Sequence, residues 1–145
     1  MSKELLSHVN TQVANWTVLY TKLHNYHWFV KGPNFFSLHE KFEELYNEAG
    51  VHIDELAERL LALGGKPVAT LKGALEMATV KEASGGEKAS DMVRQLSEDF
   101  TNLAEELKEG IGYAEDANDD ATGDMLIGIK NSLEKHAWML SAYLE

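Results

Sequence analysis

The chain has 145 residues, of which 24 are acidic and 13 are basic, so its formal net charge is −11. That length suits one domain, and we expect residues 1–145 to form it. The sequence contains no cysteine, which excludes disulfides, thiolate zinc sites, iron–sulfur clusters and cysteine nucleophiles. The negative charge repels phosphate backbones and attracts cations.

No segment of the sequence has the pattern of a targeting or membrane-spanning element. The first eight residues lack an apolar signal core, and no apolar run approaches the ~20 residues that a membrane span needs. We therefore expect a cytoplasmic protein with no membrane partner.

The first half of the chain has the pattern of two long helices. From Glu4 to about Phe29, apolar residues recur at gaps of three and four, which is the period of one helical face. Glycine and proline within 31–34 favour a turn. Ser37 and Glu40 have the spacing of a capping box, so a second helix is predicted from Ser37 to Leu63, where two glycines follow.

The second half predicts two further long helices after a mixed connection. A short helix is expected between Thr70 and Thr79, followed by a glycine-containing loop. The third long helix runs from about Ser90 to Tyr113, and the fourth starts near Asp119 with Trp138 among its inward residues. Each pair forms an antiparallel hairpin, and the long connection between the pairs is typical of an all-α, ferritin-like four-helix bundle with a crossover that carries a short helix.

Candidate metal ligands lie in the first half of the chain, where five of the six histidines precede residue 53. His39 and Glu43 are four residues apart, and so are Asp54 and Glu58, so each pair shares a helix face. His27 lies near the end of the first helix. Imidazole nitrogens with several carboxylate oxygens suit iron, manganese or zinc.

A structural interpretation of the same residues is also open. An acid–histidine pair on one helix is usually part of a solvated face, and Trp28 at a helix end more often packs than reacts. His24 would then lie on the surface or be hydrogen-bonded in the core, and His52 and His136 would be core or surface residues. The clustering of all candidate ligands in one half of an acidic chain favours a metal site.

Any such site has to be completed from outside one bundle. A bundle that binds two metals internally usually takes Glu from two helices and Glu-x-x-His from the other two. This chain has no Glu-x-x-His, and its third and fourth helices offer only His136. A second copy of the chain across a two-fold axis is the economical completion.

Several ordered segments of the sequence resemble the Dps-type mini-ferritins (DNA-binding protein from starved cells), a family of the ferritin-like superfamily. The resemblance covers nearly the whole chain. It rests on His27-Trp28, Gly32, Asn34-Phe35, Leu38-His39-Glu40, the run from Asp54 to Arg59, Leu63-Gly64-Gly65 and the run from Ser132 to Met139.

The resemblance implies a hollow homododecamer of four-helix subunits. Its activity would be that of a ferroxidase, which oxidises Fe(II), preferentially with hydrogen peroxide, stores the ferric mineral and protects against oxidative stress. Carried over by position, His27, His39 and Glu43 would come from one subunit, and Asp54 and Glu58 from its two-fold partner, with two irons at each site. Glu43 stands where some members have aspartate.

The resemblance also implies a role for each ligand. Glu58 would anchor or bridge the first iron with Asp54 and His27, while the other two ligands would hold a second, weaker iron or a water. Trp28 could give up an electron when only one iron is present, so it joins His27, Asp54 and Glu58 among the expected catalytic residues.

A second acidic cluster surrounds the start of the fourth helix. Acids there can simply complement the helix macrodipole and cap the helix. The family interpretation is that Asp120 and Asp124, one turn apart, line a three-fold pore for iron entry, with Glu115 or Asp116 at its mouth. Three copies would concentrate negative charge and attract Fe(II).

Two other functions compete with iron chemistry. The first is a nucleoid protein that binds and protects DNA, and the second is a purely structural bundle whose acids are solvated. Family members that coat DNA usually use a lysine-rich tail, whereas here Lys3 is balanced at once by Glu4 and the chain ends at Leu144-Glu145. Twelve copies would carry 12 × −11 = −132 formal charges, so DNA binding is disfavoured and ferroxidase activity with iron storage is predicted.

Overall fold

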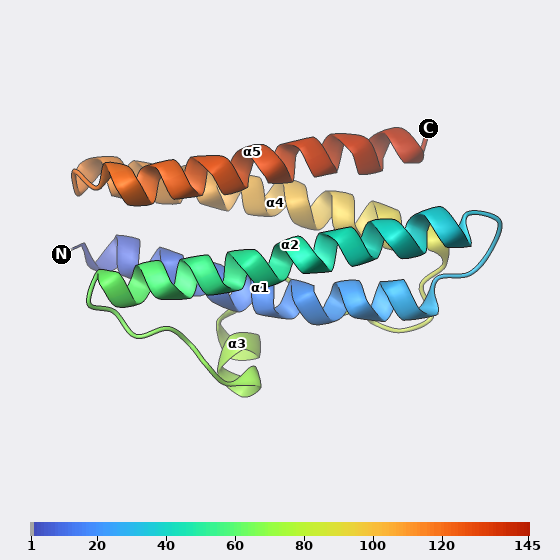
Figure 1. Cartoon of the computed structure of the whole chain (residues 1–145), viewed down its shortest axis with the longest axis horizontal. Helices are drawn as coiled ribbons and strands as arrows, with labels where there is room; N and C mark the ends of the chain where they lie inside the picture. Colours follow the sequence, from blue (N-terminus) through green and yellow to red (C-terminus); the bar gives the residue numbers. More distant parts are fainter. Residues whose placement is uncertain (1) are drawn as a thin grey trace. The chain divides into compact units, whose positions relative to one another are not determined.

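The computed structural model describes residues 2–145, and it contains five helices in this range and no strand. Their bounds are α1 Lys3–Phe29, α2 Phe35–Ala62, α3 Leu71–Met77, α4 Ala89–Asp116 and α5 Asp120–Tyr143 (Figure 1). The four predicted long helices and the predicted short helix are all present. None of the described helices is both long enough and apolar enough to cross a membrane.

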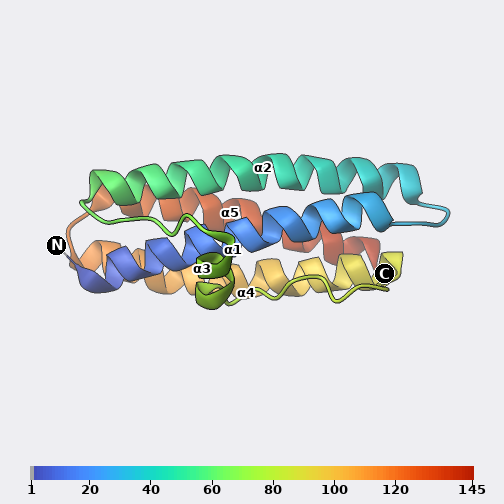
Figure 2. The same cartoon turned by 90° about the horizontal axis from the view of Figure 1, so that it is seen from below.

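The first compact unit, Leu6–Ala89, is built on the antiparallel hairpin of α1 and α2, which lie side by side in both views (Figures 1 and 2). Ring contacts fix their register, because Trp16 contacts His52 while Tyr26, further along α1, contacts Phe42, earlier on α2. The inward residues of α1 recur with the predicted period: Leu5, Val9, Val13, Trp16, Leu19 and Leu23 are all at most 3% exposed. Tyr20, expected on that face, is 39% exposed.

The turn between α1 and α2 differs from the predicted capping box. Helix α2 begins at Phe35 after Asn34, whose side chain makes no cap hydrogen bond. Ser37 lies inside the first turn, where its hydroxyl donates to the Asn34 carbonyl at 3.1 Å. Gly32 adopts φ +113°, a conformation that glycine adopts without strain, and this residue allows the helix to start earlier than predicted.

Two glycines end α2, as predicted, and direct the chain into the connection. Gly64 adopts φ +87°, and the Gly65 amide donates to the Leu60 carbonyl at 2.9 Å. A Cβ atom on Gly65 would lie 2.7 Å from Cδ1 of Leu60, so a larger residue there would have to displace the Leu60 side chain.

The connection after α2 is held along α1 by asparagine side chains. Oδ1 of Asn10 accepts from the Val68 amide at 2.8 Å, and Oδ1 of the buried Asn15 accepts from the amides of Thr79 and Val80. Between these points, Thr70 caps α3 by accepting from the Gly73 amide. Figure 2 shows α3 as a short piece beside α1.

The second compact unit joins residues 2–5 to Ser90–Glu145 and contains the antiparallel hairpin of α4 and α5. The Ser97 and Ser141 hydroxyls are 2.8 Å apart, and Phe100 packs near His136. Asn118 turns the chain with φ +55°, and Asp119 caps α5 through the Thr122 amide. Trp138, predicted to face inward, is 68% exposed, so this prediction is wrong: Ala137 and Leu140 supply the buried face there instead.

Candidate metal-binding site on the first helical hairpin

Two of the predicted ligands meet where the α1–α2 hairpin closes. The rings of His27 on α1 and His39 on α2 are stacked, with centroids 3.7 Å apart and planes inclined by 12°. His27 is 7% exposed, whereas His39 is half-buried. The sequence predicted both residues as ligands, but their direct contact depends on the register of the hairpin.

Backbone carbonyls fix which nitrogen of each neutral ring carries the hydrogen. Nδ1 of His27 lies 2.7 Å from the His39 carbonyl, and Nδ1 of His39 lies 2.7 Å from the His27 carbonyl. A carbonyl only accepts, so each Nδ1 must carry the hydrogen, and each neutral ring then has its lone pair on Nε2. Imidazoles held through Nδ1 in this way are prepared to bind a metal through Nε2.

The side chains around this histidine pair are acidic and aromatic. Oε1 of the exposed Glu43 lies 3.9 Å from Nε2 of His27. Phe35 stacks on His39, and Tyr46 meets His27 edge-on at a centroid distance of 5.3 Å. Burial raises the pKa of the Tyr46 phenol, and Glu43 and Tyr20 raise it further.

The other two predicted ligands lie elsewhere on the same helix. Asp54 and Glu58 are both exposed side chains on α2. Glu43 and Asp54 are eleven residues apart along this helix, which corresponds to a rise of ~16 Å. One chain therefore brings His27, His39 and Glu43 together and leaves Asp54 and Glu58 apart from them.

Among residues 2–145, no group of three or more histidine, aspartate and glutamate side chains is placed to hold a metal ion. His27, His39 and Glu43 are neighbours in one chain, but they are not arranged as a complete ligand set.

An aromatic cluster beside the histidine pair was not anticipated from the sequence. His24 stacks on Tyr46 with centroids 3.7 Å apart, and it also contacts Tyr20 at 4.6 Å and Trp28 at 5.3 Å. The i, i+4 spacing of Tyr20, His24 and Trp28 on α1 was the available signal, because such residues share a helix face. Nδ1 of His24 is 2.7 Å from the Tyr20 carbonyl, so this histidine is half-buried and hydrogen-bonded.

His52 and His136, which the sequence placed either in the core or on the surface, are both buried. His52 packs against Trp16, and its Nε2 lies 3.1 Å from a carboxylate oxygen of Glu48. His136 is 7% exposed and lies near Phe100.

The acids predicted to form an iron-entry pore are all on the surface. Glu115 and Asp116 end α4, and Asp120 and Asp124 lie in the first turns of α5, each of them exposed. Asp119, in contrast, acts as a cap, because its Oδ1 accepts from the Thr122 amide and its Oδ2 from the Thr122 hydroxyl at 2.6 Å. The cap and the exposed acids are thus separate features of this cluster.

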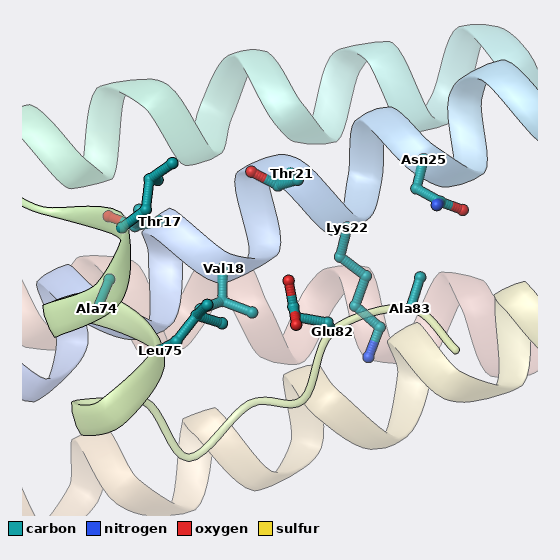
Figure 3. Close-up of a pocket in the computed structure, with 10 residues that line it drawn as sticks. Thr17, Val18, Thr21, Lys22, Asn25, Ala74, Leu75, Glu82 and Ala83 are labelled. Atoms are coloured by element: carbon teal, nitrogen blue, oxygen red, sulfur yellow. The ribbon is translucent and has the colours of Figure 1, made fainter. Parts of the chain in front are cut away.

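A cavity of about 170 Å³ opens between α1, α3 and the segment after α3 (Figure 3). Thr17, Val18, Leu75 and Glu82 are among the residues that line it, and the buried Lys22 beside them donates to the Lys81 carbonyl at 2.8 Å. None of the predicted metal ligands lines this cavity.

Comparison with known proteins places the chain in a family. The family model of the ferritin-like domain matches residues 6–145. General stress protein 20U of Bacillus subtilis is 62% identical over 99% of both chains, and DNA protection during starvation protein 2 of Bacillus anthracis is 56% identical over 99% of both. The crystal structure of Dps from Staphylococcus aureus superimposes with a TM-score of 0.98 at 57% identity, covering 99% of this chain and 97% of that one.

These comparisons confirm the predicted fold class, which is the ferritin-like four-helix bundle with a short helix between its second and third long helices. Identity above one half over nearly the full length is more than a shared fold requires. The chain belongs to the ferritin-like family and is a Dps-type mini-ferritin.

Proposed function

We propose that this protein is a cytoplasmic ferroxidase and iron store, which oxidises Fe(II) with hydrogen peroxide at sites shared by two copies of the chain. Each chain contributes one ferritin-like domain over its whole length. The observation that carries the proposal is the distribution of ligands along α2, where two donor groups lie on one uninterrupted helix and are separated by ~16 Å of rise.

A two-fold axis crossing α2 midway between its donor groups would unite them. That midpoint lies near Glu48 and Ala49, at equal distances from the His39/Glu43 group and the Asp54/Glu58 group. An antiparallel copy of α2 would then set Asp54 and Glu58 of one chain opposite His39 and Glu43 of the other. Because the contact is isologous, two facing sites would form together.

The donors suit iron in both oxidation states. The Nε2 atoms of His27 and His39 present lone pairs, while the carboxylates of Glu43, Asp54 and Glu58 supply the oxygen ligands that favour Fe(III). Each peroxide accepts two electrons, and two Fe(II) ions held side by side supply one each. In this proposal Glu58, Asp54 and His27 hold the first iron, and His39 and Glu43 hold the second.

Assembly and iron entry complete the proposal. Twelve subunits would enclose the ferric mineral, and the exposed Asp120 and Asp124 would attract Fe(II) to a three-fold pore with Glu115 or Asp116 at its mouth. Storage of oxidised iron and consumption of peroxide would together limit oxidative damage.

A co-assembly experiment tests the shared site directly. His27→Gly and Glu58→Gln each remove one half of the site, so each variant alone should lose most of its peroxide-dependent Fe(II) oxidation, measured as ferric absorbance. Particles refolded from an equal mixture contain interfaces with one variant on each side. One site of each such interface has intact ligands from both chains, so about a quarter of the wild-type activity should return.

The same experiment has a clear opposite outcome. If each site lay within one subunit, the mixture would be as inactive as the separate variants. Glu105→Gln, which changes an exposed acid of α4, serves as the matched charge control and should oxidise iron at the wild-type rate.

A further inference from the structure

The histidine pair is part of a stack of three rings. Phe35 stacks on His39 with centroids 4.9 Å apart and planes inclined by 22°, and His39 stacks on His27 at 3.7 Å and 12°. Among residues 2–145, Phe35 and His27 make no ring contact with each other, so they lie on opposite faces of His39. These three residues, Phe35, His39 and His27, are called the ring stack below.

The turn between α1 and α2 places Phe35 in this stack. The Phe35 amide donates to the carbonyl of Gly32, which has φ +113°, and α2 begins at Phe35. Phe35 and His39 are then four residues apart on one helix and share a face. A helix that began at Ser37 would leave Phe35 outside this face, so the early start of α2 brings the phenyl ring onto the histidine.

Parallel rings restrict how two histidines bind metal. A metal ion binds an imidazole nitrogen along its lone pair, which lies in the plane of the ring. An ion midway between rings 3.7 Å apart would lie half of that distance, about 1.8 Å, out of each plane, which is most of a metal–imidazole bond of ~2.1 Å. Such an ion would face the rings and not their lone pairs. The stacked histidines therefore suit two separate ions, which in two-metal sites lie ~3.5–4 Å apart.

The two histidines are held in this arrangement to different degrees. His27 is 7% exposed, and its ring contacts Tyr46 as well as His39. His39 is half-buried, and among residues 2–145 its ring is held by the hydrogen bond to the His27 carbonyl and by the rings of His27 and Phe35. A single hydrogen bond lets a ring tilt about its own direction. The plane of His39 thus depends on the rings on its two faces.

We propose that Phe35 is a positioning residue, whose ring keeps His39 parallel to His27 so that the pair binds two metal ions and does not close on one. This inference rests on the proposed function, because it assumes a metal site at the histidine pair. It deepens that function, since peroxide takes two electrons and each Fe(II) supplies one. Phe35 acts through His39, and it contacts neither the metal nor the oxidant.

Cobalt(II) binding to the assembled, iron-free particle tests this role without iron chemistry. Calorimetric titration counts the ions that the wild type binds and the His27→Gly/His39→Gly double variant does not, so ions on other acids are left out. We expect two such ions per chain. In Phe35→Leu, the second ion should bind about tenfold more weakly, as is typical when a group that orients a ligand is lost, while the first keeps its affinity.

Matched variants show whether the flat ring is responsible. Phe35→Tyr keeps the ring and should bind both ions as the wild type does. Phe36→Leu changes a neighbour that is 81% exposed and contacts Phe35 but no histidine among the described residues, so it should also bind both ions. Phe35→Met fills the space with a flexible side chain and should behave as Phe35→Leu, even if the leucine variant fails to assemble. Weakened binding in Phe35→Tyr would overturn the proposal.

A double-mutant cycle separates positioning from a general effect on the fold. In a His39→Gly background, Phe35→Leu should leave the affinity of the remaining ion unchanged, because the residue through which Phe35 acts is gone. Equal weakening of that ion in both backgrounds would show a merely structural role and would overturn the proposal.

Iron kinetics provide a second readout. In Phe35→Leu, the Fe(II) concentration at half-maximal rate should rise several-fold, while the maximal rate stays near that of the wild type, because saturating Fe(II) refills the second position. A lower maximal rate with an unchanged half-saturation would contradict this role.

The two proposals fail in different ways. If the wild type bound two histidine-dependent Co(II) ions but did not oxidise Fe(II) with peroxide, the proposed function would be wrong and the role of Phe35 in binding would stand. Two ions bound equally well by Phe35→Leu, or a single ion in the wild type, would overturn the role of Phe35 alone. No histidine-dependent Co(II) in the wild type would overturn both.

Discussion

His27 and His39 show how a short turn can orient two proposed metal ligands before any metal arrives. Each ring donates through Nδ1 to the carbonyl of the other residue, so a single pair of contacts fixes both side-chain orientations and both tautomers. The exchange requires the two residues to face each other across the hairpin. The turn that begins α2 at Phe35 therefore determines how the ligands are presented.

Glu87 is the residue for which the structure predicts a pH dependence of stability. Burial raises the pKa of its carboxyl, but hydrogen bonds from the Ser84 backbone, its own backbone, Tyr26 and the Ser84 side chain outweigh this, so the pKa lies below its usual value of 4.5. Oε1 also accepts from the amide of Gly85, which has φ +90°. The carboxylate thus holds the loop that leads into α4.

Because the folded pKa is lowered, the ionised carboxylate stabilises the fold above the unfolded value and ceases to do so as the pH falls through the folded value. Glu87→Gln should therefore lower the thermal midpoint at neutral pH, and the gap to wild type should narrow as the pH falls below 4.5. Thermal unfolding followed by circular dichroism across this range measures both effects. The control is Glu82→Gln, which changes an exposed acid of the same connection and should neither lower the midpoint nor change the gap with pH. A gap for Glu87→Gln that did not change with pH would refute this role of the Glu87 carboxylate.

At the scale of the helix, periodicity predicted the elements well because each long helix buries one regular face. Gly64 and Gly65 marked the end of α2, since Gly64 has a positive φ, which favours glycine, and a Cβ at position 65 would crowd the Leu60 side chain. The errors arose where local pattern and tertiary contact differ. Ser37 had capping spacing but lies within the helix, and Trp138 and Tyr20 are apolar by composition yet exposed.

The sequence predicted the candidate site only as far as spacing within a single helix allows. Spacing on one helix paired His39 with Glu43 and Asp54 with Glu58, and the lack of Glu-x-x-His indicated that one bundle is insufficient. The stacking of His27 on His39 depends on the register between two helices, which periodicity does not define. The contact of Tyr46 with His24 was missed for the same reason.

Two kinds of acidic residue lie at the start of α5. Asp119 caps the helix, whereas Asp120 and Asp124 are proposed to attract iron, and substitutions can test this difference. Asp119→Ala removes the cap acceptor for the Thr122 amide and should cost about 1 kcal/mol of stability, seen as a lower thermal midpoint. Asp120→Asn with Asp124→Asn should keep most of the thermal midpoint but slow iron uptake several-fold, because the charge that attracts Fe(II) is gone.

Calorimetry measures the thermal midpoints, and the rate at which ferric absorbance rises at limiting Fe(II) measures iron uptake. Glu98→Gln with Glu105→Gln removes the same charge from exposed positions of α4 and serves as the control. Equal slowing by that pair would attribute the effect to net charge and not to a pore.

At the scale of the whole molecule, net charge is the property that favours iron over DNA as the proposed partner. Relatives of this chain carry the name "DNA protection during starvation protein", yet protection can come from removing iron and peroxide as well as from coating DNA. A formal charge of −11 per chain opposes association with a polyanion and favours the capture of cations.

We therefore expect no retardation of duplex DNA by the assembled protein in a mobility-shift assay, even at low salt, where electrostatic binding is strongest. Added magnesium should be the condition most favourable to any association, because divalent cations can bridge two negative surfaces. A variant with six of its exposed acids changed to lysine, Glu76, Asp91, Glu98, Glu105, Glu109 and Glu134, shifts the net charge by +12 per chain, from −11 to +1, and should begin to retard DNA, which calibrates the assay. Tight binding by the wild type without magnesium would mean that a local basic surface outweighs the net charge, and the DNA-coating function would then have to be placed beside iron oxidation.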